Sequence, residues 1–562
     1  MKKTWLWAIL LLIVIAPSHL ISNDRAITID EPWWIISGSN YYYALTHRDF
    51  ANTQYDYHPA VTTTWMVTAG MITTFPEYRI YGQGYFDVRK PHFEEFFREH
   101  NHDVLQLLRN TRFIQSVLIF IFAVLAFYFL QFIVNPQVAF LSIAVPMLSP
   151  FFLGHSRLLN HESMLAVFVL VSFLAFYVYL HKEKKIIYLV FSGFAFGLAQ
   201  LTKSSSIVLM PLIGLMLLIN LFQKDEKPLL TKLIVATKTF GIWLASALLI
   251  YFMLWPSMWV QPIKTLQEVY GNAFSYAFQG GRLAVTEELT PTTFSLENRL
   301  DGLLLYFNYW LSGTTFITWL GIIFAGYVVF TKDKTFILVK RLCMYLLLLG
   351  SLFIFMFGLA QGRNYAHYIM SSFVAFDVIA GIGWGSIWLW LQNKYQNLNK
   401  APVNIIFVLA LALTQIGFGL PYAPYYFTYK NPLATRAATF GYGEGYDQAA
   451  EYLSTKPNAS EMRVYVYNGM GTFSYLFAGE TLVFKRVYLI DESYQQIVEE
   501  IKSSDYLVLY PIIRKKQPET EKLFTVFESI VPEKTIVIND IEYVYIYKVS
   551  EIPQAVYEAL LR

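Results

Sequence analysis

The stretch ESMLAVFVLVSFLAFYVYLH, residues 162–181, decides the class of this protein. After Glu162 it contains no Asp, Glu, Lys or Arg. A helix needs roughly 17 to 25 predominantly apolar residues to cross a lipid bilayer, and this run is long enough. We therefore predict a transmembrane helix here.

Similar runs recur on both sides of this stretch, so the chain is predicted to cross the membrane about eleven times as an all-α polytopic domain. The segment VTTTWMVTAGMITTF, residues 61–75, is apolar but short and threonine-rich, so we interpret it as interfacial or re-entrant. The predicted spans centre near 5–21, 112–134, 137–153, 162–181, 186–202, 204–222, 233–254, 312–330, 342–360, 367–391 and 403–421.

The composition supports this class and excludes others. Of 562 residues, 55% are hydrophobic and only 15% are charged, which is too little polar material for one water-soluble globule. A net charge of +3 and the lack of a basic block argue against nucleic acid as a partner. The single cysteine, Cys343, excludes an intrachain disulfide. Residues 1–22 are interpreted as an uncleaved first helix.

Lysine and arginine in the loops predict the orientation, because positive charge is retained on the cytoplasmic side. The lysine-bearing connections alternate with the others along the chain, and they lie at residues 2–3, 181–185, 223–232, 331–341 and 391–400. The long loops 23–111 and 255–311, the shorter links between them and the tail are therefore predicted to be extracytoplasmic. We expect a multi-pass protein of the plasma membrane.

After about residue 425 the pattern changes to short β-branched and tyrosine-rich strings such as RVYVYN, DYLVLY, KTIVIN and EYVYIYKV. They alternate with the helix-like pieces GEGYDQAAEYL, SYQQIVEEIKSS and IPQAVYEALL. This alternation predicts a small α/β domain over residues 425–562, beyond a membrane domain over residues 1–424.

An acidic pair follows the first predicted helix closely, in TIDEPWWIISGSNYYYAL. Asp30 and Glu31 would lie near the membrane surface, where one carboxylate can act as a general base while the other accepts hydrogen bonds from a substrate. Alternatively, the pair caps the next helix, with Pro32 in its first turn.

The same loop contains ANTQYDYHPAVTTTW, residues 51–65. Here Asp56 and His58 are candidate site residues, since a histidine can donate to a phosphate oxygen or orient a carboxylate. The histidines of KPHFEEFFREHNH, residues 90–102, lack the spacing of a recognised metal site. That stretch is interpreted as an amphipathic helix on the membrane surface.

Three basic residues stand at predicted outer ends of helices, on the side where surplus positive charge is unusual. They are Arg157 in GHSRLLNHES, Lys203 in LAQLTKSSS and Arg363 in QGRNYAHY. Together they could hold the phosphate of a lipid carrier, or each could extend to lipid headgroups. Trp255 and Trp259 in WPSMWVQP could stack on a sugar or belong to the interfacial aromatic belt.

Taken in order along the chain, these motifs resemble the type C glycosyltransferases of the protein O-mannosyltransferase and aminoarabinose transferase superfamily. The resemblance is carried by DEPWW, YHPAVTTTW, HSRLLNHES, LTKSSS and WPSMW, and it covers most of residues 1–450. It implies the type C glycosyltransferase fold and an inverting transfer of a sugar from a polyprenyl-phosphate donor, without a metal or another cofactor.

Carried over residue by residue, the resemblance implies that Asp30 is the general base and that Glu31 holds the acceptor. Arg157 and Lys203 would stabilise the departing lipid phosphate, with help from Arg363. Family members usually have an aspartate a few residues after the Ser-Arg element, whereas this chain reads Asn160, His161, Glu162. Glu162 is therefore the candidate substitute.

The sequence thus predicts a transferase that moves a sugar from a dolichyl- or undecaprenyl-phosphate carrier to a protein, glycan or lipid acceptor outside the cytoplasm. A transporter or flippase of lipid-linked saccharides is the alternative, although the chain shows no internal repeats. A non-catalytic scaffold whose outer domain binds a partner is a third hypothesis.

Overall fold

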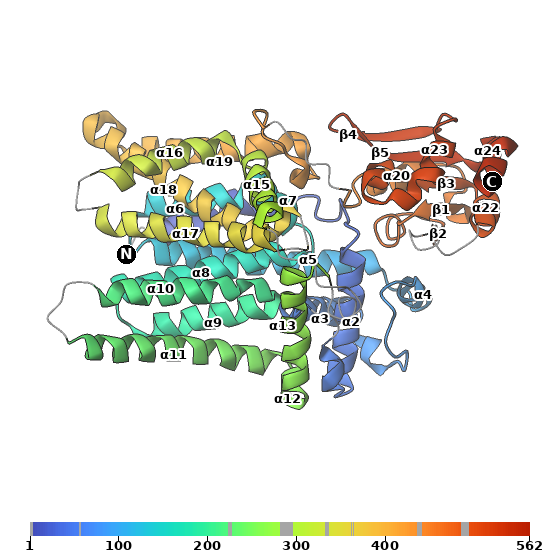
Figure 1. The fold of residues 1–562 in the computed structure, drawn as a ribbon. Helices are drawn as coiled ribbons and strands as arrows, with labels where there is room; N and C mark the ends of the chain where they lie inside the picture. The colour runs from blue at the N-terminus through green and yellow to red at the C-terminus, as the bar shows by residue number, and fades with distance from the viewer. Residues whose placement is uncertain are drawn as a thin grey trace.

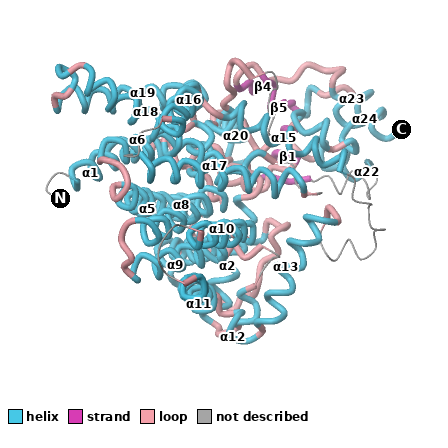
Figure 2. Tube along the Cα trace, turned by 60° about the vertical axis from the view of Figure 1, so that its left-hand side comes forward, coloured by secondary structure: helices cyan, strands magenta, loops and turns pink. Residues whose placement is uncertain are grey.

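The fold is that of a computed structural model, which describes residues 4–54, 58–222, 228–281, 296–331, 336–360, 362, 365–434, 441–484 and 494–562. Long helices form a bundle, and a small mixed sheet with its own helices lies at one end of it (Figure 1). A second view shows the strands gathered at one side of the molecule, away from the N-terminus (Figure 2). The predicted fold class, a helical membrane domain followed by a small α/β part, is confirmed.

Seven helices of the described chain are long and apolar enough to cross a membrane. Two bent pairs, α6 (Pro136–Met147) with α7 (Pro150–Ser156) at 65° and α15 (Leu296–Gly313) with α16 (Phe316–Phe330) at 107°, raise that number to nine if each pair is one span. Two further apolar helices, α1 (Thr4–Leu20) and α9 (Ile186–Thr202), have only 17 residues each. The protein is therefore an integral membrane protein, but the predicted count of eleven spans is not confirmed.

The helices of the bundle coincide with the predicted runs, except that α15 lies mostly within residues 255–311, which were predicted to be an outer loop. They are α1 (Thr4–Leu20), α5 (Val104–Leu130), α6 (Pro136–Met147), α7 (Pro150–Ser156), α8 (His161–His181), α9 (Ile186–Thr202), α10 (Leu209–Leu221), α11 (Leu229–Leu254), α15 (Leu296–Gly313), α16 (Phe316–Phe330), α17 (Ile337–Leu359), α18 (Met370–Lys394) and α19 (Ala401–Gly419).

The stretch quoted first becomes α8, the most buried of the candidate spans. Its apolar side chains point in every direction, and 94% of its most apolar window is buried among neighbouring helices. Such a helix belongs inside a bundle rather than at its surface. α8 therefore forms the centre of the membrane part.

Shorter helices cover the end of the bundle that faces the sheet. They are α2 (Glu31–Thr46), α3 (Val61–Thr74), α4 (His92–Glu99), α12 (Ser257–Val260) and α13 (Pro262–Phe278). Of these, α2, α12 and α13 run crosswise to the long helices (Figure 1). The 14-residue α3 is shorter than a spanning helix requires, which agrees with the interpretation of residues 61–75 as interfacial or re-entrant.

The predicted amphipathic helix at residues 90–102 is present as α4, but its apolar side does not face the membrane. Phe93 and Phe97 are fully buried within the protein. The ring of Phe97 packs against Phe75, with the centroids 5.2 Å apart. The expectation of a membrane-surface helix is thus wrong, because the loop supplies its own aromatic core for α4.

The C-terminal part contains a five-stranded sheet of order β2-β1-β3-β5-β4. β1 pairs in parallel with β2 and β3, and β5 pairs antiparallel with β3 and β4. The four β-branched or tyrosine-rich strings form β1, β3, β4 and β5, whereas β2 was not predicted. The elements are β1 (Arg463–Tyr467), β2 (Glu480–Phe484), β3 (Tyr506–Leu509), β4 (Lys534–Ile538), β5 (Ile541–Lys548), α20 (Tyr446–Ser454), α22 (Tyr494–Lys502), α23 (Glu521–Phe527) and α24 (Gln554–Leu561).

This part has a hydrophobic core separate from that of the bundle. Val464, Leu507 and Val544 of the sheet are fully buried in it, together with Leu453 of α20 and Leu560 of α24. A core of its own is typical of a domain, but Ala26 and Leu158 also belong to this core, and the division at residue 425 stays a prediction.

Close approach of α9 and α11 depends on two glycines one helical turn apart. A methyl group added to Gly193 would lie 2.3 Å from the main-chain oxygen of Trp243, and one added to Gly197 would lie 2.7 Å from that of Ala247. Small residues at this spacing let membrane helices pack backbone to backbone.

We therefore predict that Gly193→Ala destabilises the protein by about 1–3 kcal/mol, since main-chain atoms must move to admit the methyl group. Thermal unfolding in detergent micelles measures the loss. The matched control is Gly214→Ala on α10, where an added methyl group meets open space. Equal melting temperatures for the two variants would contradict the packing argument.

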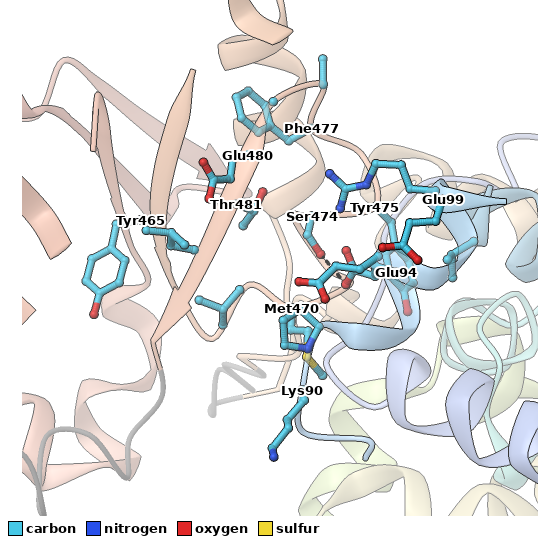
Figure 3. A pocket seen from close by; sticks show the side chains of 18 of the residues that line it. Lys90, Glu94, Glu99, Tyr465, Met470, Ser474, Tyr475, Phe477, Glu480 and Thr481 are labelled. Atoms are coloured by element: carbon cyan, nitrogen blue, oxygen red, sulfur yellow. Dashed lines mark hydrogen bonds between the residues drawn. The ribbon is translucent and has the colours of Figure 1, made fainter. Parts of the chain in front are cut away.

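The C-terminal part touches the segment between α1 and α5 through Glu94 of α4. The Ser474 hydroxyl donates to Glu94 Oε1 at 2.8 Å across this contact (Figure 3). Burial raises the pKa of the Glu94 carboxyl to about 7, against the opposing effect of the Ser474 hydrogen bond. In the unfolded chain this carboxyl has its ordinary, lower pKa. At pH values between that pKa and the raised one, the folded state therefore binds a proton that the unfolded state has released.

It follows that this carboxyl costs stability as the pH rises through its raised pKa. We expect Glu94→Gln, which still accepts the Ser474 hydrogen bond, to melt at a higher temperature than the parent at about pH 8, with the difference shrinking toward about pH 5. Glu95→Gln, on the exposed side of α4, is the control. A Glu94→Gln protein that is less stable at both pH values would refute the prediction.

Candidate active site

A cavity of about 410 Å³ lies where several bundle helices end on the side of the sheet. The start of α2, the start of α8 and the end of α9 contribute to its wall, together with α13 and the turn before α18. Its lining residues are Thr28, Ile29, Asp30, Trp33, Trp34, His58, Leu159, Asn160, His161, Glu162, Lys203, Tyr276, Tyr365, His367 and Tyr368.

Four of the predicted site residues meet in this cavity: Asp30, His58, Glu162 and Lys203. They come from widely separated parts of the sequence. The structure therefore brings together the acidic residue after the first helix and the basic residue after α9, as the sequence pattern predicted.

Asp30 occupies the N-cap position of α2, with Pro32 in the first turn. Its side chain makes no capping hydrogen bond and is exposed at the cavity. Helix capping, the alternative considered for the acidic pair, thus explains the proline but not the Asp30 carboxylate.

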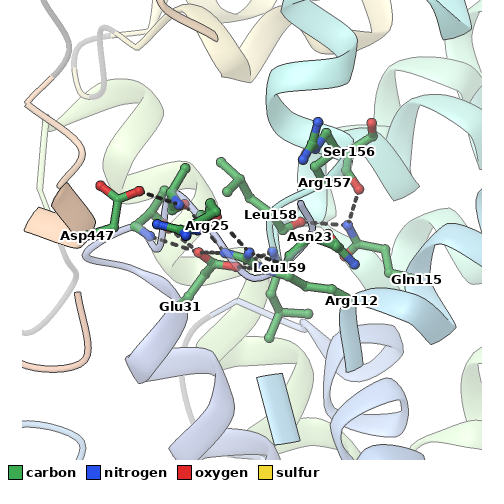
Figure 4. A network of polar contacts seen from close by, with 12 residues as sticks. Asn23, Arg25, Glu31, Arg112, Gln115, Ser156, Arg157, Leu158, Leu159 and Asp447 are labelled. Atoms are coloured by element: carbon green, nitrogen blue, oxygen red, sulfur yellow. Dashed lines mark hydrogen bonds and ion pairs between the residues drawn. The ribbon is translucent and has the colours of Figure 1, made fainter. Parts of the chain in front are cut away.

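Glu31 is completely buried and does not line the cavity. Arg112 of α5 donates to both of its carboxylate oxygens, at 2.8 and 2.6 Å (Figure 4). The main-chain N–H groups of Thr28 and Leu159 donate to the same carboxylate at 2.8 and 2.6 Å. With both oxygens occupied by protein donors, the predicted contact of Glu31 with the acceptor does not fit the structure.

Arg112 was not among the predicted site residues, although an arginine within an apolar helix is a known functional signal. It is 1% exposed, and besides Glu31 it donates to the main-chain oxygens of Asn23 and Arg25 at 2.7 and 3.0 Å. Arg112 therefore fastens the segment before α2 to α5. Because Asp30 belongs to this segment, Arg112 also fixes the position from which the Asp30 side chain extends.

Lys203 and Glu162 form a buried ion pair at the cavity wall. Lys203 is the C-cap residue of α9, and Glu162 lies in the first turn of α8. The Lys203 ammonium also lies 4.2 Å from the ring centroid of Tyr368, a cation–π arrangement. Lys203, whose ammonium we predicted to contact the lipid phosphate, is thus held between a carboxylate and an aromatic ring.

Aromatic rings and histidines complete the wall. The Trp34 ring lies 4.0 Å from that of His161 and 6.3 Å from that of His58, centroid to centroid. His161 is held by Thr63, whose hydroxyl lies 2.8 Å from Nδ1. Of these rings only His58 was predicted as a site residue; Trp34 and His161 were not, and only the DEPWW motif pointed to Trp34.

The C-terminal tail reaches the cavity through Tyr442. Its hydroxyl lies 3.1 Å from Nδ1 of His367, a lining residue. The pKa of the Tyr442 phenol is raised well above its ordinary value, chiefly by burial and next by the negative charge of Asp30. The tail therefore lies within electrostatic range of Asp30.

Arg157 is not among the lining residues. It is 6% exposed, and its guanidinium donates to the main-chain oxygens of Ser18, Ile21 and Ser22, beyond the end of α1 and within it. Its plane lies over the ring of Tyr426. Because the carbonyl oxygens at the end of a helix need donors, this geometry gives Arg157 a capping role and does not support direct contact with a phosphate.

The two predicted tryptophans also lie outside the cavity lining. Trp255 is fully buried and donates to the main-chain oxygen of Thr53 at 3.2 Å. Trp259 is 46% exposed and donates to the main-chain oxygen of Phe252 at 2.7 Å. Neither ring is placed to stack on a sugar inside this cavity, and the interfacial aromatic belt stays a prediction for Trp259. Asp56 and Arg363 lie outside the described residues.

Residues 106–251 match the model of a family described as dolichyl-phosphate-mannose-protein mannosyltransferase. The match contains Arg112, Arg157, Glu162 and Lys203. It confirms the resemblance to the protein O-mannosyltransferase and aminoarabinose transferase superfamily over this segment. No curated protein matches the sequence.

Among solved structures, the chain is similar to ArnT from Cupriavidus metallidurans bound to undecaprenyl phosphate, at 13% identity and a TM-score of 0.46 over 97% of this chain and 98% of that one. It is also similar to the oligosaccharyltransferase AglB from Archaeoglobus fulgidus, at 11% identity and a TM-score of 0.46 over 93% and 70%. Similarity to the S. cerevisiae Pmt1-Pmt2 complex covers 46% and 34%, at 17% identity and a TM-score of 0.33.

The buried pair of Glu31 and Arg112 yields a stability prediction. Glu31→Leu leaves the guanidinium buried without a carboxylate and should cost about 3–5 kcal/mol. The double variant Glu31→Leu/Arg112→Leu should lose much less than the sum of the two single variants. Thermal unfolding of Glu31→Leu, Arg112→Leu and the double variant, each compared with the parent protein, measures the interaction between the two side chains.

The nearby ion pair of Asp24 and Arg109 is the matched control, because its side chains are 38% and 41% exposed. Asp24→Leu should cost less than about 1 kcal/mol. If the buried and the exposed pair proved equally dispensable, the fastening role of Arg112 would be excluded.

Proposed function

We propose that this protein is an inverting glycosyltransferase, which moves a sugar from a polyprenyl-phosphate donor to a protein, glycan or lipid acceptor on the non-cytoplasmic face of the membrane. One observation carries the proposal: Asp30 and Lys203 line the same cavity at the ends of membrane helices. Its volume of about 410 Å³ falls in the range of small-molecule sites.

In the proposed reaction, an acceptor hydroxyl or amine attacks the anomeric carbon of the donor sugar. Asp30 takes the proton of the attacking group as the new bond forms. The bond between the anomeric carbon and the phosphate oxygen breaks, and the polyprenyl phosphate leaves with its electron pair. A single displacement of this kind inverts the anomeric centre.

Lys203 is proposed to stabilise the departing phosphate. Negative charge grows on this group as the bond breaks, and a cation already in place inside a cavity lowers the barrier more than one in water. Glu162 forms an ion pair with the Lys203 ammonium, so it positions the positive charge of Lys203. His58, on the same wall, is a second candidate donor to the phosphate.

The aromatic wall supports a sugar as the transferred group. Trp33, Trp34, Tyr276 and Tyr368 line the cavity beside Asp30. Aromatic rings provide large apolar contact areas, and their N–H and O–H groups offer polar contacts at the same time. A sugar has both apolar ring faces and hydroxyls and therefore suits this lining.

The charge of the helix ends supports the proposed sidedness. The cavity lies at the start of α8, and Lys182, Lys184 and Lys185 follow the other end of that helix. Lys394 closes α18, whose preceding turn also borders the cavity. Since lysine is retained on the cytoplasmic side, the cavity would open on the opposite side.

The test is Asp30→Asn in purified protein supplied with a polyprenyl-phosphate sugar and an envelope extract as acceptor. Loss of the general base should reduce turnover by roughly a hundredfold to ten-thousandfold, measured as release of polyprenyl phosphate. Donor binding should remain, because the lysine is untouched.

Asp24→Asn is the control, since this carboxylate stands on the same segment but outside the cavity lining. Full turnover by Asp30→Asn would overturn the assignment of the base. Movement of intact donor across vesicle membranes without any turnover by the parent protein would establish the transporter alternative instead.

A further inference from the structure

A second and larger hollow, of about 950 Å³, lies between α4 and the edge of the sheet (Figure 3). Its wall on one side is α4, with Glu95 and Glu99, and on the other side it is β2, with Thr481 and Val483. It shares no lining residue with the cavity of Asp30. We refer to it as the α4–β2 groove.

β2 is an edge strand of the described sheet. Its hydrogen bonds to β1 alternate along the chain, as in any parallel pair. The Glu480 N–H donates to Met462 at 2.9 Å, and the Phe484 carbonyl accepts from Asn468 at 2.8 Å. The main-chain groups of Thr481 and Val483, which lie between these residues, therefore point away from β1.

Thr481 and Val483 both line the groove. Within the described residues, no strand pairs with β2 on this side. A row of main-chain donors and acceptors along a sheet edge is a template for an extended peptide, which can add as another strand. One side of the groove is therefore a strand edge whose main-chain groups can pair with an added strand.

The charge of the groove favours a basic occupant. Six of its lining residues are acidic, and three are lysine or arginine. Glu95 and Glu99 lie exposed on α4, opposite the strand. Lysine or arginine side chains of an added strand would extend toward these carboxylates, whereas acidic side chains would be repelled.

The groove adjoins the start of α2 through the loop before β2. Met470, Ser474 and Tyr475 of this loop line the groove. Between them, Gly471 lies so close to Pro32 that an added methyl group would be 2.0 Å from the proline Cγ. Pro32 is in the first turn of the helix whose N-cap is Asp30, so the loop that lines the groove also packs against the helix that carries the proposed base.

We propose that the α4–β2 groove binds an extended polypeptide segment with lysine or arginine side chains as an added strand on β2, and that this segment belongs to the acceptor. The inference rests on the proposed function, and it narrows the acceptor to a protein. Main-chain pairing with Thr481 and Val483 aligns the segment along β2. The carboxylates of α4 favour segments with lysine or arginine side chains.

The probe is a short fluorescent peptide of alternating valine and lysine, titrated against the full-length protein in detergent micelles by anisotropy. Val483→Pro removes the N–H that faces the groove without removing a bond to β1, and edge strands tolerate proline. Binding should weaken roughly tenfold, as for one lost hydrogen bond. Val483→Ala keeps the N–H and should bind as the parent does.

Two further titrations keep the result independent of how well Val483→Pro folds. A peptide with N-methylated amides on alternate residues cannot pair as a strand and should not bind the parent protein. Glu99→Lys should weaken the lysine peptide and strengthen a glutamate peptide, whereas Glu558→Lys on α24, outside the groove lining, should change neither. Equal binding of the methylated and unmethylated peptides would overturn the proposal.

Turnover separates this inference from the proposed function. If the parent protein binds the peptide as expected but releases no polyprenyl phosphate from the donor, the groove stands and the transferase fails. If donor is consumed and Val483→Pro modifies the lysine peptide as fast as Val483→Ala does, the transferase stands and the groove proposal fails.

Discussion

The buried contact between Glu31 and Arg112 is the constraint on which the rest of the site depends. A carboxylate and a guanidinium removed from water are tolerated only when each finds nearly all of its hydrogen-bond partners in the protein. Glu31 meets this demand with Arg112 and the main-chain N–H of Leu159, and so joins the start of α2 to α5 and to the turn before α8. Asp30 precedes Glu31 directly, so its position at the cavity follows from the buried pair.

The same segment is held from the other side by the C-terminal part. The Ile29 N–H donates to the Tyr442 carbonyl at 3.0 Å, and the Ala26 N–H donates to Asp447 at 3.3 Å. Arg25 adds an ion pair with Glu451 at 2.6 Å. The segment that carries the proposed base is thus shared between the membrane bundle and the sheet-bearing part. The proposed binding at the sheet edge and the proposed chemistry at Asp30 would therefore both act on this short segment.

Features that depend on local sequence could be predicted, and those that depend on packing could not. Apolar length predicted most of the long helices, and polar residues at the predicted helix ends singled out Asp30 and Lys203, which the structure places in one cavity. Arg112 escaped because its partner Glu31 is 81 positions away, and only the packing of α5 against the loop brings them together. Arg157 looked like a phosphate ligand because its motif can be recognised locally. The direction of its side chain, however, is set by the main-chain oxygens at the end of α1. β2 was missed because ETLVF is short and its pairing with β1 is not visible in its own residues.

The three charges at the cavity also follow a rule that ties them to helix ends. Asp30 stands at the N-cap of α2 and Glu162 in the first turn of α8, where the helix dipole favours negative charge. Lys203 stands at the C-cap of α9, where it favours positive charge. Each charge is therefore stabilised by its own helix before it meets a substrate. The end of α8 fixes the backbone of Glu162, and its side chain reaches the Lys203 ammonium from there.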